Sequence, residues 1–165
     1  MTMGQQLLAE FEQELATTRR VLERVPEEHF AWRPHETSMS LGQLALHVAE
    51  VPAAVTQMLQ QDTMEAPNFV QAEATSRAEI LTALDQSAST VGALLSTADD
   101  AWLMSPWAMT RDGREIMRMP RVGLMRVVGM NHIYHHRGQI AMCLRMLGVA
   151  VPSIYGPSRD ENPFA

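Results

Sequence analysis

Three histidines of this chain have the spacing of ligands for one metal ion. His132 and His136 lie four residues apart in the segment NHIYHHRGQI, and His47 lies in SLGQLALHVAEV. On a helix, residues four apart lie on the same face, about 40° from each other. Each histidine stands where the helical pattern has an apolar residue, so we expect all three side chains to point into the interior.

Inward imidazoles need partners. Each ring has two nitrogens to satisfy where water is scarce, and protonated rings would repel one another. A divalent cation removes both difficulties, because neutral imidazole is a good ligand and an i, i+4 pair can chelate one ion together with a third histidine. Spacing alone does not decide whether His135 or His136 binds the ion together with His132, since His135 is also about one turn from His132. His29 and His35, in or beside a loop, are expected to satisfy local backbone groups.

Helical periodicity indicates the elements that position these residues. Four segments carry it, at about 4–25, 40–60, 77–96 and 120–147. The second and third begin with capping boxes, at Ser40 to Gln43 and at Ser76 to Glu79, and Pro52 predicts a kink or a local break. The fold class expected is all-α, a four-helix bundle in a single domain over residues 1–165.

Two connections between the predicted helices differ in character. The stretch 62–75 is polar and unpatterned, which is typical of a long crossover in an up-down-down-up bundle. Asp112-Gly113 lies between two short mixed runs and predicts a hairpin turn, so we expect a short hairpin-like insertion between helices three and four.

Stepping about 100° per residue along the last helix sorts its other side chains. Gln139 and Cys143 fall on the histidine face, and Cys143 is too far from His136 for easy ligation. Tyr134 points away from this face. The arginines fall on the opposite, solvent side: Arg126, Arg137 and Arg145. Most methionines are expected to fill the core: examples are Met125, Met142 and Met146.

The composition of the chain argues against several classes of function. All 13 basic residues are arginine, against 19 acidic residues, and the net charge of −6 argues against nucleic-acid binding. The single Cys143 excludes an internal disulfide and a cysteine-based zinc site. No Glu-x-x-His occurs, which excludes the di-iron carboxylate bundles. The 13 methionines leave a soft copper site or an adaptable binding groove as the alternative to core filling. We expect no signal peptide, no membrane span and a cytoplasmic location.

The segments AWRPHETSMS, SLGQLAL before His47, and NHIYHHRGQIAMCLRMLGVAVPSIYG resemble the DinB family, within the DinB/YfiT-like superfamily of metal-dependent four-helix-bundle enzymes. The resemblance spans nearly the whole chain, and HHRGQ is its most specific part. It implies an up-down-down-up bundle with a divalent metal, zinc or nickel, held by His47, His132 and His136 and not by His135. It also implies a homodimer, which is common in the family. A small-molecule substrate is implied as well, because the superfamily includes S-transferases and a maleylpyruvate isomerase that use low-molecular-weight thiols.

Three protein ligands leave an open coordination position, as in catalytic zinc sites. A bound divalent ion lowers the pKa of water to about 7 or deprotonates a thiol, so thiol transfer and hydrolysis are both expected reactions.

Gln139 could hydrogen-bond a ligand histidine, or be a buried amide satisfied by the first helix. Glu50 could act as a general base or fix a tautomer, or lie on the solvated flank. The alternative function is a non-catalytic metal- or small-molecule-binding bundle with a structural ion.

Overall fold

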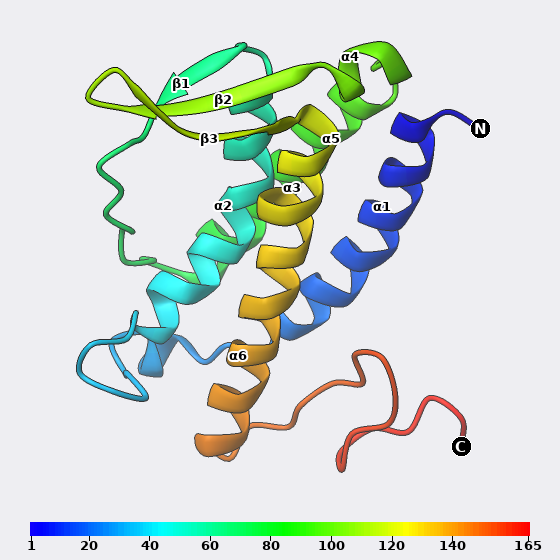
Figure 1. Ribbon diagram of the computed structural model, residues 1–165. Coiled ribbons are helices and arrows are strands. Elements are labelled where there is room, and N and C mark those ends of the chain that lie inside the picture. The colour runs from blue at the N-terminus through cyan, green and yellow to red at the C-terminus, as the bar shows by residue number, and fades with distance from the viewer.

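The long helices of the computed structural model, which describes residues 1–165, lie side by side around one apolar core (Figure 1). They are α1 (Met3–Leu22), α2 (Leu41–Leu59), α3 (Arg77–Leu95) and a final helix built from three segments. The final helix consists of α5 (Arg121–Leu124), the π-helical segment η2 (Met125–Asn131) and α6 (His132–Met146). In Figure 1, α1 and α6 run in one direction, and α2 and α3 run in the other.

A three-stranded mixed sheet covers one end of the helices (Figure 1). Its strands are β1 (Thr63–Glu65), β2 (Pro106–Arg111) and β3 (Arg114–Pro120), in the order β1-β2-β3. The first pair is parallel and the second antiparallel. The prediction of a pure all-α four-helix bundle is therefore wrong. The short helices η1 (Glu27–His29) and α4 (Asp100–Met104) are further additions.

The predicted hairpin turn lies at the expected residues, but the hairpin is larger than a short insertion. Asp112 and Gly113 both have positive φ, 52° and 73°, the geometry of a two-residue type I′ turn. β1 escaped notice because three residues in a polar stretch carry no alternating pattern, and their pairing depends on β2 being alongside. Trp107 of β2 is fully buried, and its indole N–H donates to the Met58 carbonyl at the end of α2. This contact ties the sheet to the helix that carries His47.

The N-terminus of α2 has the predicted capping box. The Ser40 hydroxyl accepts from the Gln43 N–H, and the Gln43 side chain accepts from the Ser40 N–H. At α3, Ser76 accepts from the Glu79 N–H, but the Glu79 carboxylate accepts from Thr75, so only half of the second box forms.

The helix α2 continues through Pro52 without a break. A hydroxyl from α3 compensates for the disturbed hydrogen-bond ladder, because Ser87 accepts from the Ala53 N–H and donates to the Ala49 carbonyl. The backbone around Pro52 is therefore held by α3, next to the turns that present His47.

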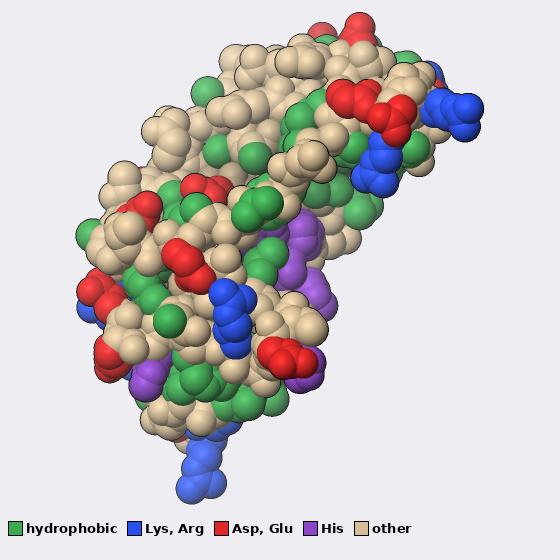
Figure 2. Space-filling view, turned by 90° about the vertical axis from the view of Figure 1, so that its left-hand side faces the viewer, with side chains coloured by type: hydrophobic (Ala, Val, Ile, Leu, Met, Phe, Trp, Pro, Cys, Tyr) green, Lys and Arg blue, Asp and Glu red, His purple; other side chains and the backbone are tan.

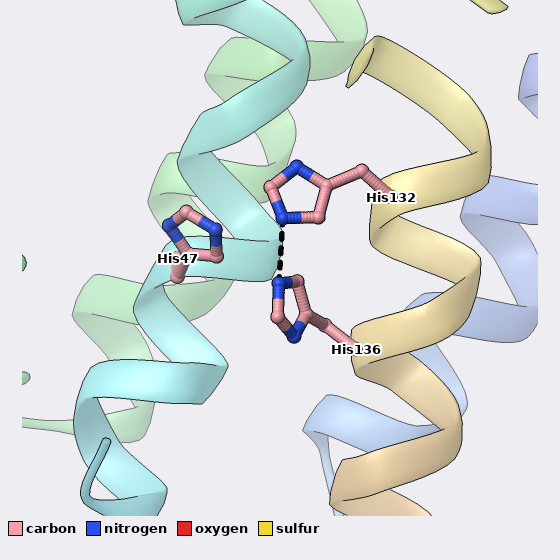
Figure 3. A group of neighbouring side chains, drawn as sticks. All are labelled: His47, His132 and His136. Carbon is pink, nitrogen blue, oxygen red and sulfur yellow. Dashed lines mark hydrogen bonds between the residues drawn. The ribbon is translucent and has the colours of Figure 1, made fainter. Parts of the chain in front are cut away.

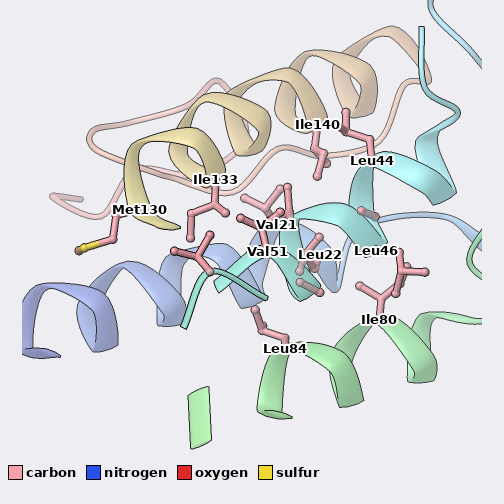
Figure 4. Close-up of a cluster of buried hydrophobic side chains, with 14 of the residues drawn as sticks. Val21, Leu22, Leu44, Leu46, Val51, Ile80, Leu84, Met130, Ile133 and Ile140 are labelled. Carbon is pink, nitrogen blue, oxygen red and sulfur yellow. The ribbon is translucent and has the colours of Figure 1, made fainter. Parts of the chain in front are cut away.

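The core lies between the four long helices, and Figure 4 shows buried side chains from α1, α2, α3 and the final helix in contact. α2 is the most enclosed element and is buried over most of its circumference. His47 lies on the inward side of this helix and is 6% exposed, so its imidazole must be accommodated inside the protein.

Two expectations for the last helix are wrong. Arg137 is 1% exposed rather than solvated, because α1 and the C-terminal tail cover the face that helical stepping assigned to solvent. Met142 and Met146 are 63% and 59% exposed rather than core residues, whereas Met125 is buried as expected.

None of the helices combines the length and the apolar character that a membrane crossing requires.

Candidate metal centre

The three histidines predicted as ligands meet between α2 and α6 (Figure 3). One nitrogen of each ring lies within 4.8 Å of the others. The ring centroid of His47 is 5.2 Å from that of His132 and 5.0 Å from that of His136. No other group of three histidine, cysteine or carboxylate side chains comes together in this way.

Regular helix geometry produces this convergence. His132 and His136 lie one turn apart on α6 and face α2, where His47 occupies the middle turns and is 6% exposed. His135 is exposed, and its ring lies beside that of His136, tilted by 59° with 5.1 Å between the ring centroids. The structure therefore groups His132 with His136 and leaves His135 outside.

A hydrogen-bond chain fixes the tautomer of His47. The Gln71 amide N–H donates to the Glu50 carboxylate at 3.0 Å, and a carboxylate accepts only. The Gln71 amide oxygen therefore faces His47 Nδ1, at 3.0 Å, and Nδ1 must carry the proton. Nε2 is left as an unprotonated acceptor, buried and without any hydrogen-bond partner.

His136 is held in the same way, because its Nδ1 lies 2.6 Å from the Gln139 amide oxygen. The Nε2 atoms of His132 and His136 face each other at 2.6 Å. Two lone pairs at this separation repel unless a proton or a cation is shared between them.

The surroundings keep these imidazoles neutral. Burial, with the neighbouring histidines acting in the same direction, lowers the pKa of His132 to about 4. Burial also lowers the pKa of His47 and of His136, against the opposing effects of their glutamine partners. Neutral imidazole is the form that binds metal ions.

These residues fit a divalent metal ion. Three neutral imidazoles converge with Nε2 inward, and one inward Nε2 is buried without a partner. The Nδ1 atoms of His47 and His136 are directed to acceptors, as is usual for metal-binding histidines. Zinc, nickel, cobalt and copper all accept such a donor set, and three ligands leave a coordination position free.

Of the supporting residues, Gln139 and Glu50 were proposed from the sequence and Gln71 was missed. Gln139 contacts His136 directly, whereas Glu50 is exposed and reaches His47 only through Gln71. Gln71 is 8% exposed and lies in the connection between β1 and α3, which has no periodicity from which an inward side chain could be inferred. Phe69 of the same connection packs on the His47 ring at 5.4 Å.

Two cavities border the histidines on different sides. The first, which we call the methionine cavity, has a volume of about 560 Å³ and includes His136 and Gln139 in its wall. The second, which we call the Glu50 cavity, has a volume of about 360 Å³ and is bordered by His47, Glu50 and Gln71. Figure 2 shows histidine side chains gathered at an edge of the molecule where the surface is hollowed. Small molecules could therefore approach the histidines from two directions.

The fold and the site together define a helical protein with a small capping sheet and a three-histidine centre suited to a divalent ion. The sequence matches the DinB family over residues 1–163, and the chain belongs to that family.

Solved structures of DinB-like proteins have the same fold. One from Bacillus cereus superposes with a TM-score of 0.68 at 22% identity, covering 90% of this chain and 95% of the other. YjoA from Bacillus subtilis superposes with a TM-score of 0.67 at 17% identity, covering 95% and 99%. The uncharacterized protein YrdA of Bacillus subtilis strain 168 is 41% identical over 44 residues, so the chain spans only 26% of its length.

Proposed function

We propose that this protein is a divalent-metal-dependent transferase that joins a low-molecular-weight thiol to a carbon electrophile, with His47, His132 and His136 as the metal ligands. The observation that carries the proposal is the buried Nε2 of His47, which has no partner although its tautomer is fixed by Gln71. A protein that only packs its core has no use for a buried acceptor held in this state, since leaving it unpaired costs free energy.

The two cavities favour transfer over hydrolysis. A hydrolase requires space for one organic substrate and water, whereas a transferase must bring two organic molecules to the same centre. Beside apolar side chains, the Glu50 cavity has hydrogen-bonding groups that a hydrophilic thiol can contact: they are Glu50, Gln57, Gln71, Gln86 and Ser87. The methionine cavity has a different lining and borders a different histidine.

The reaction exchanges one bond for another. A divalent ion, when bound, supplies Lewis acidity that lowers the pKa of a thiol and makes its sulfur a nucleophile at neutral pH. The thiol proton leaves to solvent, and a sulfur electron pair forms the new C–S bond. The leaving group departs with the electrons of the bond that breaks. The protein's part is positional: Gln71 and Gln139 hold the imidazoles with Nε2 inward while the two cavities align the reactants.

The experiment uses protein purified without nickel resin, stripped with a chelator and supplied with one divalent ion at a time. Each preparation is incubated with bacterial thiols and electrophiles, and in parallel with esters and amides. We expect thiol consumption that depends on the ion. The variant His136→Ala should lose both metal binding and turnover, and the control His29→Ala, in the short helix η1, should keep both.

Three outcomes would contradict the proposal. Full activity in a folded His136→Ala variant would remove the ligand assignment. Ion-dependent cleavage of esters or amides without thiol consumption would replace transfer by hydrolysis. Tight metal binding that raises thermal stability, with no turnover of any pair, would favour a structural ion.

A further inference from the structure

The methionine cavity has a composition that the metal centre does not require. Its wall is formed by the loop before α2, by Leu44 of α2 and by the outer turns of α6. Met39, Met142 and Met146 line it, and the last two are 63% and 59% exposed. Exposed large apolar side chains gathered around a hollow are typical of binding sites, and unbranched methionine adapts to ligands of different shape.

The wall of the methionine cavity contains no arginine and no carboxylate. Its titratable residues are His135, His136 and Cys143. Burial raises the pKa of the Cys143 thiol, so this group is uncharged at neutral pH. An ionised group entering the cavity would lose water without gaining a charged partner, which is costly. The volume of about 560 Å³ is in the range of cavities that hold small organic ligands.

One polar group in the wall has an unused donor. The Gln139 amide oxygen faces His136, and its NH2 group makes no hydrogen bond within the protein. Because Gln139 is exposed and borders the cavity, this NH2 group is available to an oxygen of a bound molecule next to the histidines.

We propose that the methionine cavity is the specificity pocket for an uncharged apolar carbonyl compound, with an alkyl or aryl chain, whose carbonyl oxygen accepts from the Gln139 amide. This inference rests on the proposed function for its placement of the electrophile. It excludes carboxylates and phosphates from this side of the centre.

Binding is tested on the metal-free full-length protein with the uncharged fluorescent probe N-phenyl-1-naphthylamine. We expect saturable binding that Met142→Glu weakens at least about tenfold, because a carboxylate then lies in the apolar wall. Met104→Glu is the matched control: Met104 is 53% exposed on α4 and does not line the cavity, so the variant should bind the probe as the wild type does. Equal binding by wild type and Met142→Glu would overturn the proposal.

Competition tests the chemistry of the ligand. 2-Octanone should displace the probe, and octanoate of the same length should need at least about a tenfold higher concentration. Gln139→Leu should keep probe affinity but make 2-octanone about fivefold weaker as a competitor, the size expected for one lost hydrogen bond. Octanoate competing as well as 2-octanone would refute the uncharged class, and unchanged competition in Gln139→Leu would remove the role of the amide.

Placement next to the centre has its own test. Co²⁺ added to the probe complex should quench the probe in the wild type but not in His47→Ala, and equal quenching in both would place the probe elsewhere. Probe affinity is measured without metal, so the cavity proposal can be tested even if the protein has no enzymatic activity. If the wild type failed to bind the probe but showed metal-dependent turnover, the cavity proposal would be refuted and the proposed function would stand.

Discussion

The helix α6 carries two buried polar clusters on opposite faces, and they differ in how completely their groups are paired. On the face toward α1, Arg137 forms an ion pair with Glu14 at 2.7 Å and donates to the Thr18 hydroxyl at 3.1 Å. Tyr155 of the C-terminal tail donates to the same carboxylate at 2.9 Å, and the guanidinium stacks between the rings of Tyr134 and Tyr155. On the face toward α2, three imidazoles direct their Nε2 atoms at one another and His47 Nε2 has no partner.

The difference separates a cluster that holds the fold from one that is suited to a ligand. The Arg137 cluster is closed by its own charges, and only the guanidinium Nε lacks a hydrogen-bond partner. In the histidine cluster, the Nδ1 atoms of His47 and His136 each face a glutamine amide oxygen, while the Nε2 lone pairs converge. The first cluster is expected to control stability and the second to control what the protein binds.

The largest expected effect is on the Arg137 side. Arg137→Met removes one partner of a buried pair and leaves Glu14 half-buried without its cation, which should cost about 3–5 kcal/mol in the free energy of unfolding. Arg145→Met on the same helix removes a solvent-screened pair with Asp160 and should cost far less than Arg137→Met. Urea unfolding of the metal-free proteins measures both. Equal losses would contradict the structural role of the Arg137 cluster.

The histidine cluster and the Arg137 cluster also differ in how well the sequence predicted them. Apolar periodicity on two helices predicts that His47 and His132 point inward, and it needs no knowledge of the rest of the fold. Spacing left His135 and His136 as alternatives, and it was the resemblance to the DinB family that selected His136. Helix starts and the Asp112-Gly113 turn were also predictable, because caps and tight turns have local side-chain requirements.

The features that were missed depend on segments distant in sequence. Arg137 points to the side that α1 and the tail cover, and nothing within α6 reveals that cover. β1 forms only because β2 lies beside it, and Gln71 is directed inward by a connection without any pattern. The prediction of an all-α bundle failed for this reason, since helical periodicity is a local signal and the sheet joins segments more than 40 residues apart.

The second effect is stabilisation by metal. An ion that binds only the folded protein raises its stability by about 2.7 kcal/mol when its free concentration is 100 times the dissociation constant. We expect Zn²⁺ or Ni²⁺ to raise the melting temperature of the wild type, and of Arg145→Met by the same amount. His47→Gln should abolish the shift. A shift of full size in this variant would show that the ion binds elsewhere.

A smaller effect is expected from the residue that fixes the tautomer of His47. Gln71→Leu keeps the volume of the side chain but removes the acceptor of Nδ1, and loss of such a partner weakens metal affinity by about 10–100-fold. Gln60→Leu, an exposed change at the end of α2, is the control and should leave the affinity unchanged. Competition with a chromophoric chelator measures the affinities. An unchanged value for Gln71→Leu would mean that packing, including that of Phe69, orients the ring.

The smallest expected effect is the pH dependence of the metal-free protein. The pKa of each of the three histidines is lowered in the folded state, that of His132 to about 4, so between that value and about 6.5 the unfolded chain binds protons that the folded chain does not. The stability contributed by neutral imidazoles is thus complete above about pH 6.5 and falls as the pH decreases toward 4. Melting temperatures from pH 7.5 to 4.5 should decrease in the wild type and in Arg145→Met. They should decrease much less when all three histidines are replaced by glutamine. Equal slopes would assign the acid sensitivity to carboxylates, and the contrast between the two faces of α6 would then rest on metal binding alone.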